Sequence, residues 1–251
     1  AVNLTLLLDQ SDQQASATVY QIMRSVAYEI SLRLSGSTGG IGVTSEGLPE
    51  QERFEYIDFF LPGILGMTIM TSGVYGAVAI NTRYRKNGVL RKVATTPMTK
   101  AEWVLSKVLY QIFVAFLSMV CLVAVGVAAY GVGVQINPMV LLLVIAGSMT
   151  FSGIGMIVAR FVKDEEAAES AGAAITFPMM FLSGIFFPLS MMPAYLQTIG
   201  KVMPLYYLGE GLREAMIGGD MVAALSNGAV IFVLAVAVIA IGSVVSAWTD
   251  E

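Results

Sequence analysis

The charged side chains of this chain gather in a few short segments, and the most basic of these runs from Thr82 to Lys107. Glu102 is its one acidic residue, and six basic residues precede it: Arg83, Arg85, Lys86, Arg91, Lys92 and Lys100. Such a segment can fix membrane topology and bind anionic lipid headgroups, or it can bind a soluble partner. The residues alone leave both roles open, and one segment can serve both.

A short acidic cluster follows later in the chain, where Lys163 precedes Asp164, Glu165 and Glu166. Asp164 can cap a helix, and the two glutamates in the first turn would be stabilised by the helix dipole. A contact with the basic segment or with a partner is the alternative.

Several kinds of chemistry are excluded by what the sequence lacks. The chain has no histidine, so it lacks the commonest general base and the commonest zinc ligand. With Cys121 as its single cysteine, it can form neither an internal disulfide nor a cysteine-based metal cluster. It contains no phosphate-binding loop of the G-x-x-x-x-G-K-[ST] pattern, so it shows no means of hydrolysing ATP. We therefore expect no catalytic residue, cofactor or metal in this chain.

Four long stretches without Asp, Glu, Lys, Arg or His indicate that the chain crosses a membrane. They cover residues 59–82, 108–159, 170–200 and 221–249, and the second of them is 52 residues long. A spanning helix needs about 20 apolar residues, whereas a water-soluble fold cannot use such runs. Charged residues make up 13% of the chain, against about 25% in ordinary soluble domains. The predicted fold is an all-α polytopic membrane protein.

Five spans are predicted within a transmembrane domain that covers residues 56–251. They are 56–80, 104–130, 138–161, 170–187 and 227–248. The positive-inside rule places the basic loop, 82–104, in the cytoplasm. The alternation of the spans then places the loop at 163–166 and the C-terminus on the same side. The first two uncharged runs hold no ionisable acid or base, which disfavours proton- or ion-coupled transport.

Residues 1–55 are predicted to form part of a small extracytoplasmic α/β domain. Apolar residues alternate loosely over 1–9, which indicates a strand, and recur at helical spacing over 12–34 until the Gly/Ser/Thr stretch 35–47. Residues 1–58 carry eight acidic residues against three basic ones, which is unlike a cytoplasmic segment. Because no signal peptide is visible, we expect the chain to be a fragment that lacks at least one preceding membrane helix.

The segment between the last two spans, 188–226, is too broken by proline to cross the membrane and too apolar for a free loop. We expect an interfacial, re-entrant hairpin of short helices on the outer side, because tyrosine favours that depth. Its candidate site residues are Pro188, Pro193, Pro204, Glu210 and Arg213. Pairing between Glu210 and Arg213 that holds the hairpin is favoured over a contact with substrate.

Small residues recur in pairs within the predicted spans and allow helices to approach closely. The pairs and runs are Gly63 with Gly66, Gly73 with Gly76, 152–155 and 171–174. Packing within the chain is the favoured role, and a homodimer seam is the alternative.

Four stretches of the chain, taken in order, resemble the permease of an ATP-binding-cassette exporter of the type-2 family. They are YIDFFLPGIL at 56–65, RKNGVLRKVATTPMT at 85–99, VKDEEAA at 162–168 and PMMFLSGIFFP at 178–188. Each motif is weak alone, but four of them in the family's order and spacing are specific. The family has six spans with an external domain after the first, so five visible spans fit a chain whose first span is missing.

The resemblance implies that the basic loop contains a coupling helix, which docks onto a separate ABC ATPase subunit. The ATPase-coupling residues would be Arg83, Arg85, Lys86, Gly88, Arg91, Lys92, Thr96, Pro97 and Glu102. Gly88 can end a helix, Pro97 can begin one, and the threonine hydroxyls, including that of Thr99, can act as caps. ATP and Mg would be bound by the partner subunit.

The predicted function is that of a permease subunit in the cell membrane, which would form a homodimer among membrane lipids. It would move an amphipathic, lipid-like or drug-like substrate outward, and no nucleic acid is involved. A non-transporting membrane scaffold or assembly factor is the alternative. An intramembrane enzyme is disfavoured, because the chain has no histidine and no intramembrane pair of aspartates.

Overall fold

The computed structural model of the chain describes residues 3–8, 42–47, 56–162 and 164–245. These belong to two compact units, Ala1–Tyr56 and Ile57–Glu251, which are described separately here. Four helices in the described part are long and apolar enough to cross a membrane: Asp58–Lys86, Glu102–Tyr130, Pro138–Ala159 and Met221–Gly242. The prediction of a polytopic membrane protein is therefore confirmed at this coarser level.

The described part of the first unit is a pair of parallel strands. β1 (Asn3–Leu8) pairs with β2 (Gly42–Gly47), with Asn3 opposite Gly42 and Leu8 opposite Gly47. β1 matches the predicted strand, but β2 was read as part of a helix-breaking stretch, because its sequence is mostly small and polar. Parallel strands need a crossover of a dozen or more residues, usually a helix. The helix predicted over 12–34 falls in that crossover and lies outside the described residues.

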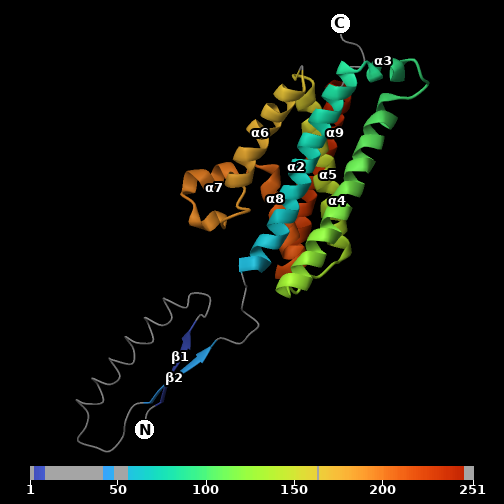
Figure 1. The fold of residues 1–251 in the computed structure, drawn as a ribbon. Coiled ribbons are helices and arrows are strands. Elements are labelled where there is room, and N and C mark those ends of the chain that lie inside the picture. The colour runs from blue at the N-terminus through green and yellow to red at the C-terminus, as the bar shows by residue number, and fades with distance from the viewer. Residues whose placement is uncertain (1–2, 9–41, 48–55, 163, 246–251) are drawn as a thin grey trace, which may run out of the picture. The chain divides into compact units, whose positions relative to one another are not determined.

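The second unit is built from helices. In chain order they are α2 (Tyr56–Lys86), α3 (Val89–Ala94), α4 (Lys100–Tyr130), α5 (Pro138–Ala159), α6 (Glu165–Leu182), the 3₁₀ turn η2 (Leu189–Met191), α7 (Ala194–Gly200), α8 (Pro204–Arg213), the π-helical turn η3 (Glu214–Gly218) and α9 (Met221–Val245). In Figure 1, α2, α4, α5 and α9 form an elongated bundle, α6 and α7 lie to one side of it, and α3 lies at one end.

α5 is the centre of the bundle. In the most apolar 18-residue stretch of α5, 67% of the stretch is buried within the chain. The corresponding share is 22% in both α4 and α9. Asn137 begins α5 by accepting a hydrogen bond from the Val140 N–H at 3.0 Å, and Pro138 occupies the first helical position, where it has no N–H to satisfy. The outer faces of α4 and α9 are left for lipid or protein to cover.

Glycines let α5 approach its neighbours closely. A Cβ placed on Gly73 of α2 would lie 2.8 Å from the Phe151 Cβ, and one placed on Gly155 would lie 2.7 Å from the Val74 carbonyl oxygen. A Cβ placed on Gly153 would likewise lie 2.8 Å from the Val238 Cγ1 of α9. The small residues at these positions therefore serve packing within the chain, which is the role that their spacing favoured.

The observed helices differ from the predicted spans at their ends. α2 continues six residues beyond the predicted end at Ile80, so that Arg83, Arg85 and Lys86 lie on its last turn rather than in a loop. α6 covers most of the predicted span 170–187. It is not among the four helices that are long and apolar enough to cross a membrane, since its 18 residues include three glutamates.

The predicted hairpin, 188–226, contains short helices, but its C-terminal boundary differs from the expectation. Leu205, Leu208 and Leu212 of α8 are fully buried, so α8 packs inside the bundle. α9 begins at Met221, six residues before the predicted span 227–248. The early start has a local cause, because Asp220 accepts hydrogen bonds from the backbone N–H groups of the next turn and acts as a helix cap.

Candidate functional site

The basic segment lies at the end of the bundle where α2 and α5 end and α4 begins, which we call the basic end. Gly88 has φ +67° and ψ 13°, a left-handed conformation that suits glycine and turns the chain from α2 into α3. α3 is six residues long, and Figure 1 shows it at this end of the bundle. The expected coupling segment is therefore a short helix that connects two membrane helices.

Exposed side chains of the basic end form a surface that we call the coupling face. In the described part of the chain it comprises Arg83, Lys86, Lys92, Thr96, Pro97, Met98 and Glu102. The backbones of Arg91 and Lys100 lie in α3 and α4, but their side chains lie outside the description. The coupling face thus contains six of the nine residues that the sequence put forward for coupling.

Arg85 has a different position from the rest of the set, because its guanidinium is directed at the end of α5. It donates hydrogen bonds to the carbonyl oxygens of Ala159 at 3.0 Å and Arg160 at 3.4 Å, and to that of Val162. The last carbonyls of a helix have no intrahelical partner, and a cation at this end also interacts favourably with the helix dipole. Arg85 therefore joins α2 to the segment between α5 and α6.

A capping box fixes the start of α4. The Thr99 Oγ1 accepts a hydrogen bond from the Glu102 N–H at 3.3 Å, and the Glu102 Oε2 accepts one from the Thr99 N–H at 2.7 Å. The predicted cap at Thr99 is present, whereas the expectation that Pro97 begins a helix is wrong. Pro97 lies in the turn between α3 and α4, since Thr99 supplies the better cap.

The hydroxyls of Thr95 and Thr96 end α3 instead of beginning a helix. They donate hydrogen bonds to the carbonyl oxygens of Lys92 at 2.7 Å and Val93 at 2.6 Å. α3 is thus bounded by a left-handed glycine at one end and by two backbone-bound threonines at the other. Both ends of α3 are therefore defined by local backbone conformation and hydrogen bonds.

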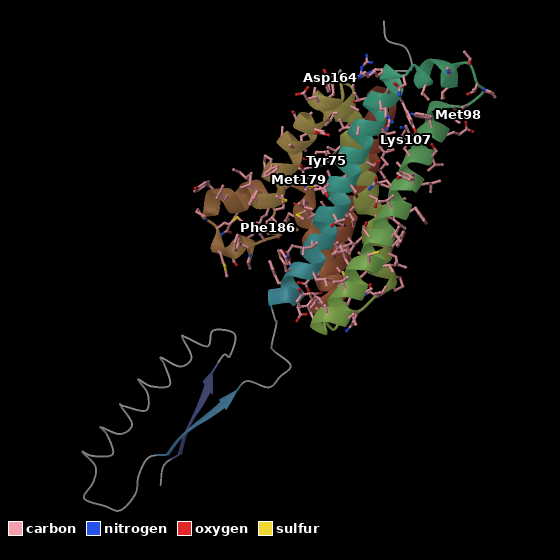
Figure 2. All side chains as sticks on the ribbon, viewed as in Figure 1. Tyr75, Met98, Lys107, Asp164, Met179 and Phe186 are labelled. Carbon is pink, nitrogen blue, oxygen red and sulfur yellow. The ribbon has the colours of Figure 1, made fainter. Side chains whose placement is uncertain are left out.

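The acidic cluster lies at the same end of the bundle, as Figure 2 shows for Asp164. The Asp164 Oδ1 accepts a hydrogen bond from the Ala167 N–H at 2.8 Å and caps α6. Glu166 is exposed, and the side chains of Lys163 and Glu165 lie outside the description. The helix-capping interpretation of Asp164 therefore has a direct structural basis.

The candidate residues of the hairpin have structural contacts. Pro188 and Pro193 precede η2 and α7, and Pro204 occupies the first turn of α8. Arg213 forms an ion pair with Glu210, and its guanidinium carbon lies 3.7 Å from the centre of the Phe59 ring. The predicted ion pair is present, and through Phe59 it also joins α8 to α2.

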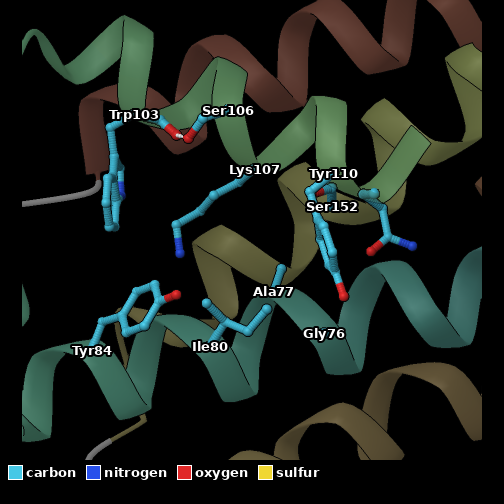
Figure 3. A pocket seen from close by; sticks show the side chains of 10 residues that line it. Gly76, Ala77, Ile80, Tyr84, Trp103, Ser106, Lys107, Tyr110 and Ser152 are labelled. Carbon is cyan, nitrogen blue, oxygen red and sulfur yellow. Dashed lines mark hydrogen bonds between the residues drawn. The ribbon is translucent and has the colours of Figure 1, made fainter. Parts of the chain in front are cut away.

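A pocket beside the basic end was not found by sequence reasoning. It has a volume of about 420 Å³ and lies between α2, α4 and α5. Figure 3 shows the Lys107 side chain extending from α4 toward α2, with its Nζ between the rings of Trp103 and Tyr84. The distances from Nζ to the two ring centres are 4.5 Å and 4.4 Å. The spacing of Trp103 and Lys107 places them on one helix face, but only the pairing of α4 with α2 adds Tyr84.

In the ranges that the structure describes, no cluster of three His, Cys, Asp or Glu residues could hold a metal ion. The arrangement provides positive charge, hydrogen-bond donors and apolar surface at one end of a helical bundle. It is suited to binding a protein surface or an anionic group.

Comparison with known proteins identifies relatives over most of the chain. A sequence model of the family described as "ABC-2 type transporter" matches residues 4–217. "Probable multidrug ABC transporter permease YbhS" of Escherichia coli K12 is 25% identical over 187 residues, which are 73% of this chain and 49% of that protein. The chain thus spans about half the length of this relative.

Two further relatives have similar levels of identity. "Daunorubicin resistance ABC transporter permease protein DrrB1" of Streptomyces coeruleorubidus is 26% identical over 171 residues, which are 65% of this chain and 59% of that protein. "Inner membrane transport permease YadH" of Escherichia coli K12 is 24% identical over 191 residues, which are 73% of this chain and 72% of that protein. Each of the three names describes a membrane permease.

Proposed function

The chain belongs to the ABC-2 type transporter family, and from this premise we propose that it is the membrane-spanning permease subunit of an ATP-driven exporter. Its coupling face would dock onto a separate ATPase subunit, which binds ATP and Mg. The observation that carries the proposal is the position of α3, a short helix between two membrane helices, with exposed basic side chains at Arg83, Lys86 and Lys92. By the positive-inside rule, this end faces the cytoplasm, where an ATPase subunit would be found.

The connections of α3 suit it to transmit movement. Gly88 and the capping box of Thr99 and Glu102 set how the chain enters and leaves the segment. Arg85 adds a connection from α2 to the end of α5 through three backbone carbonyls. A displacement of α3 would therefore act on α2, α4 and α5 together, as rigid-body transmission requires.

A homodimer and a fifth span complete the proposed assembly. Only 22% of the most apolar stretch of α4, and likewise of α9, is buried within the chain. The outer faces of both helices therefore need lipid or a second copy of the chain to cover them. α6 would be the fifth span, because Phe177 and Phe181 expose 57% and 52% of their surface on its apolar half. Residues 1–55 would then lie outside the cytoplasm.

The proposed substrate is an amphipathic, lipid-like or drug-like molecule that moves outward. Two relatives are named for multidrug transport and for daunorubicin resistance, which supports this class. The membrane helices also contain few ionisable side chains, so a small ion is a less suitable substrate.

Charge reversal on the coupling face tests the proposal. The full-length protein and its ATPase subunit are reconstituted together in proteoliposomes, with Lys86→Glu and Lys92→Glu combined in the test variant. We expect at least a tenfold loss of substrate-stimulated ATP hydrolysis, because two favourable charges become repulsive, while membrane insertion is unchanged.

The matched control is Lys201→Glu, since Lys201 is also exposed but lies at the end of α7, away from the coupling face. It should retain hydrolysis and transport. Full stimulation in the Lys86/Lys92 variant would contradict docking through this surface. Docking without transport of any substrate would favour the scaffold function instead.

A further inference from the structure

The pocket between α2, α4 and α5 contains a lysine, Lys107, that forms no ion pair with any described residue. Among the described residues that line it, Lys107 is the only charged one. Its Nζ is buried and has no hydrogen-bond partner in the described part of the chain, although an ammonium offers three donors. The nearest acid along α4, Glu102, is already bound to Thr99 in the capping box. Within the described residues, the Lys107 Nζ lies against the faces of Tyr84 and Trp103.

The lining of the pocket includes further groups that can bind an anion. Tyr110 and Ser152 belong to the lining and carry hydroxyls, and Figure 3 shows Tyr110 on the opposite side of Lys107 from the two rings. Ser106 also lines the pocket, but its hydroxyl donates to the Trp103 carbonyl oxygen at 2.8 Å. The Gln111 amide also belongs to it but donates to Ser72 at 2.8 Å, so it is partly committed. A volume of about 420 Å³ is in the range of small-molecule sites, about 300–1,000 Å³.

An apolar stripe leads away from the pocket along α4. Tyr110, Phe113 and Leu117 share one face of the helix at spacings of three and four residues. They expose 59%, 66% and 56% of their surface. Lys107 is five residues beyond Glu102, the first residue of the apolar span, or about 8 Å along the helix, and the stripe begins three residues further on. From the basic end, the positive charge of Lys107 therefore comes first and the apolar stripe follows. A lipid in a bilayer has the same order, with its headgroup first and its acyl chains deeper.

We propose that this pocket binds the phosphate of an anionic phospholipid, paired with Lys107, while an acyl chain follows Tyr110, Phe113 and Leu117. The shared chemistry would also admit a free phosphate, but the apolar stripe favours the membrane as the source. The binding does not depend on transport, and it would place a lipid beside the connection from the coupling face into α4.

The two tryptophans of the chain allow a direct measurement. Trp248→Phe leaves Trp103, a wall of the pocket, as the single tryptophan. The full chain is reconstituted in phosphatidylcholine bilayers, and part of the lipid is replaced by phosphatidylglycerol with dibrominated acyl chains, which quench nearby tryptophan. We expect roughly fivefold tighter binding of the brominated phosphatidylglycerol than of brominated phosphatidylcholine, as one additional charge pair near the surface supplies.

Variants and competitors decide the outcome. Lys107→Gln should remove the preference for phosphatidylglycerol, whereas Lys107→Arg and the surface control Lys201→Gln should retain it. Equal quenching by the two lipids, or a preference that persists in Lys107→Gln, would overturn the proposal. Inorganic phosphate that reverses quenching at millimolar concentration would overturn the assignment to a lipid. If Lys107→Gln fails to fold, the comparison of the two lipids in the Trp248→Phe protein still decides.

Discussion

The close contact of α2 with α5 predicts a large difference between two glycine-to-alanine substitutions. In Gly155→Ala, the new Cβ would lie 2.7 Å from the Val74 carbonyl oxygen and 2.7 Å from the Ala77 Cβ. In Gly76→Ala, the nearest atom would be the Gln111 Oε1 at 3.5 Å, an ordinary contact. Both glycines lie inside long helices, so the intrinsic helix preference for alanine is about the same in both.

The expected magnitude follows from the overlap alone, because the helix-propensity gain cancels between the two variants. Ordinary contact begins at about 3.4 Å, so α2 and α5 must separate by about 0.7 Å at Gly155. A backbone oxygen cannot rotate away as a side chain can. Overpacking of this kind costs about 1–3 kcal/mol, which corresponds to a difference of roughly 2–12 °C in Tm for a protein of this size.

The assay is thermal unfolding of the full chain in detergent, followed by size-exclusion chromatography of the fraction that remains folded. Gly155→Ala should have the lower Tm, and Gly76→Ala should match or exceed the unsubstituted protein. Equal Tm values for the two variants would refute the close packing of α2 on α5, and with it the connection between the coupling face and the centre of the bundle.

Three further substitutions test individual contacts by the same thermal assay. Arg85→Gln should lower the free energy of unfolding by about 1.5–3 kcal/mol, since the charged donor to three carbonyls is lost. Arg83→Gln is the control, because Arg83 is exposed, and it should change this free energy by less than about 0.5 kcal/mol. Equal effects of the two substitutions would contradict the contact of Arg85 with α5. Thr99→Ala should cost about 1 kcal/mol through loss of the cap, and an unchanged Tm would mean that the capping box contributes nothing. Arg213→Leu should destabilise more than Lys201→Leu, because only Arg213 is paired and packed against an aromatic ring; the reverse order would be inconsistent with its position.

The membrane helices could be predicted from sequence because an uncharged run of sufficient length has few other uses. The runs at 59–82 and 108–159 contain most of α2, α4 and α5, and the turn at Gly131 divides the longer one. Helix ends were predicted less well, since they depend on single side chains. Asp220 begins α9, although the predicted span starts at 227, and Thr99 begins α4, where the neighbouring threonines offered the same kind of cap.

Contacts between helices could not be predicted, because they depend on the relative position of separate elements. Arg85 appeared in the sequence as one of six similar cations, and only the end of α5 distinguishes it. Lys107 appeared as the end of a basic segment, and its pocket exists because α2 brings Tyr84 beside it. β2 was missed because its polar sequence becomes a strand only through pairing with β1.

The central claim, that the coupling face contacts a separate ATPase subunit, can be measured by site-specific cross-linking. Cys121 is the single cysteine, so Cys121→Ala provides a cysteine-free background. Thr96→Cys on the coupling face should cross-link to the ATPase subunit in membranes, whereas Met191→Cys, on the exposed part of η2, should not. A cross-link formed only from position 191, or from neither position in an assembly that hydrolyses ATP, would contradict the proposed docking.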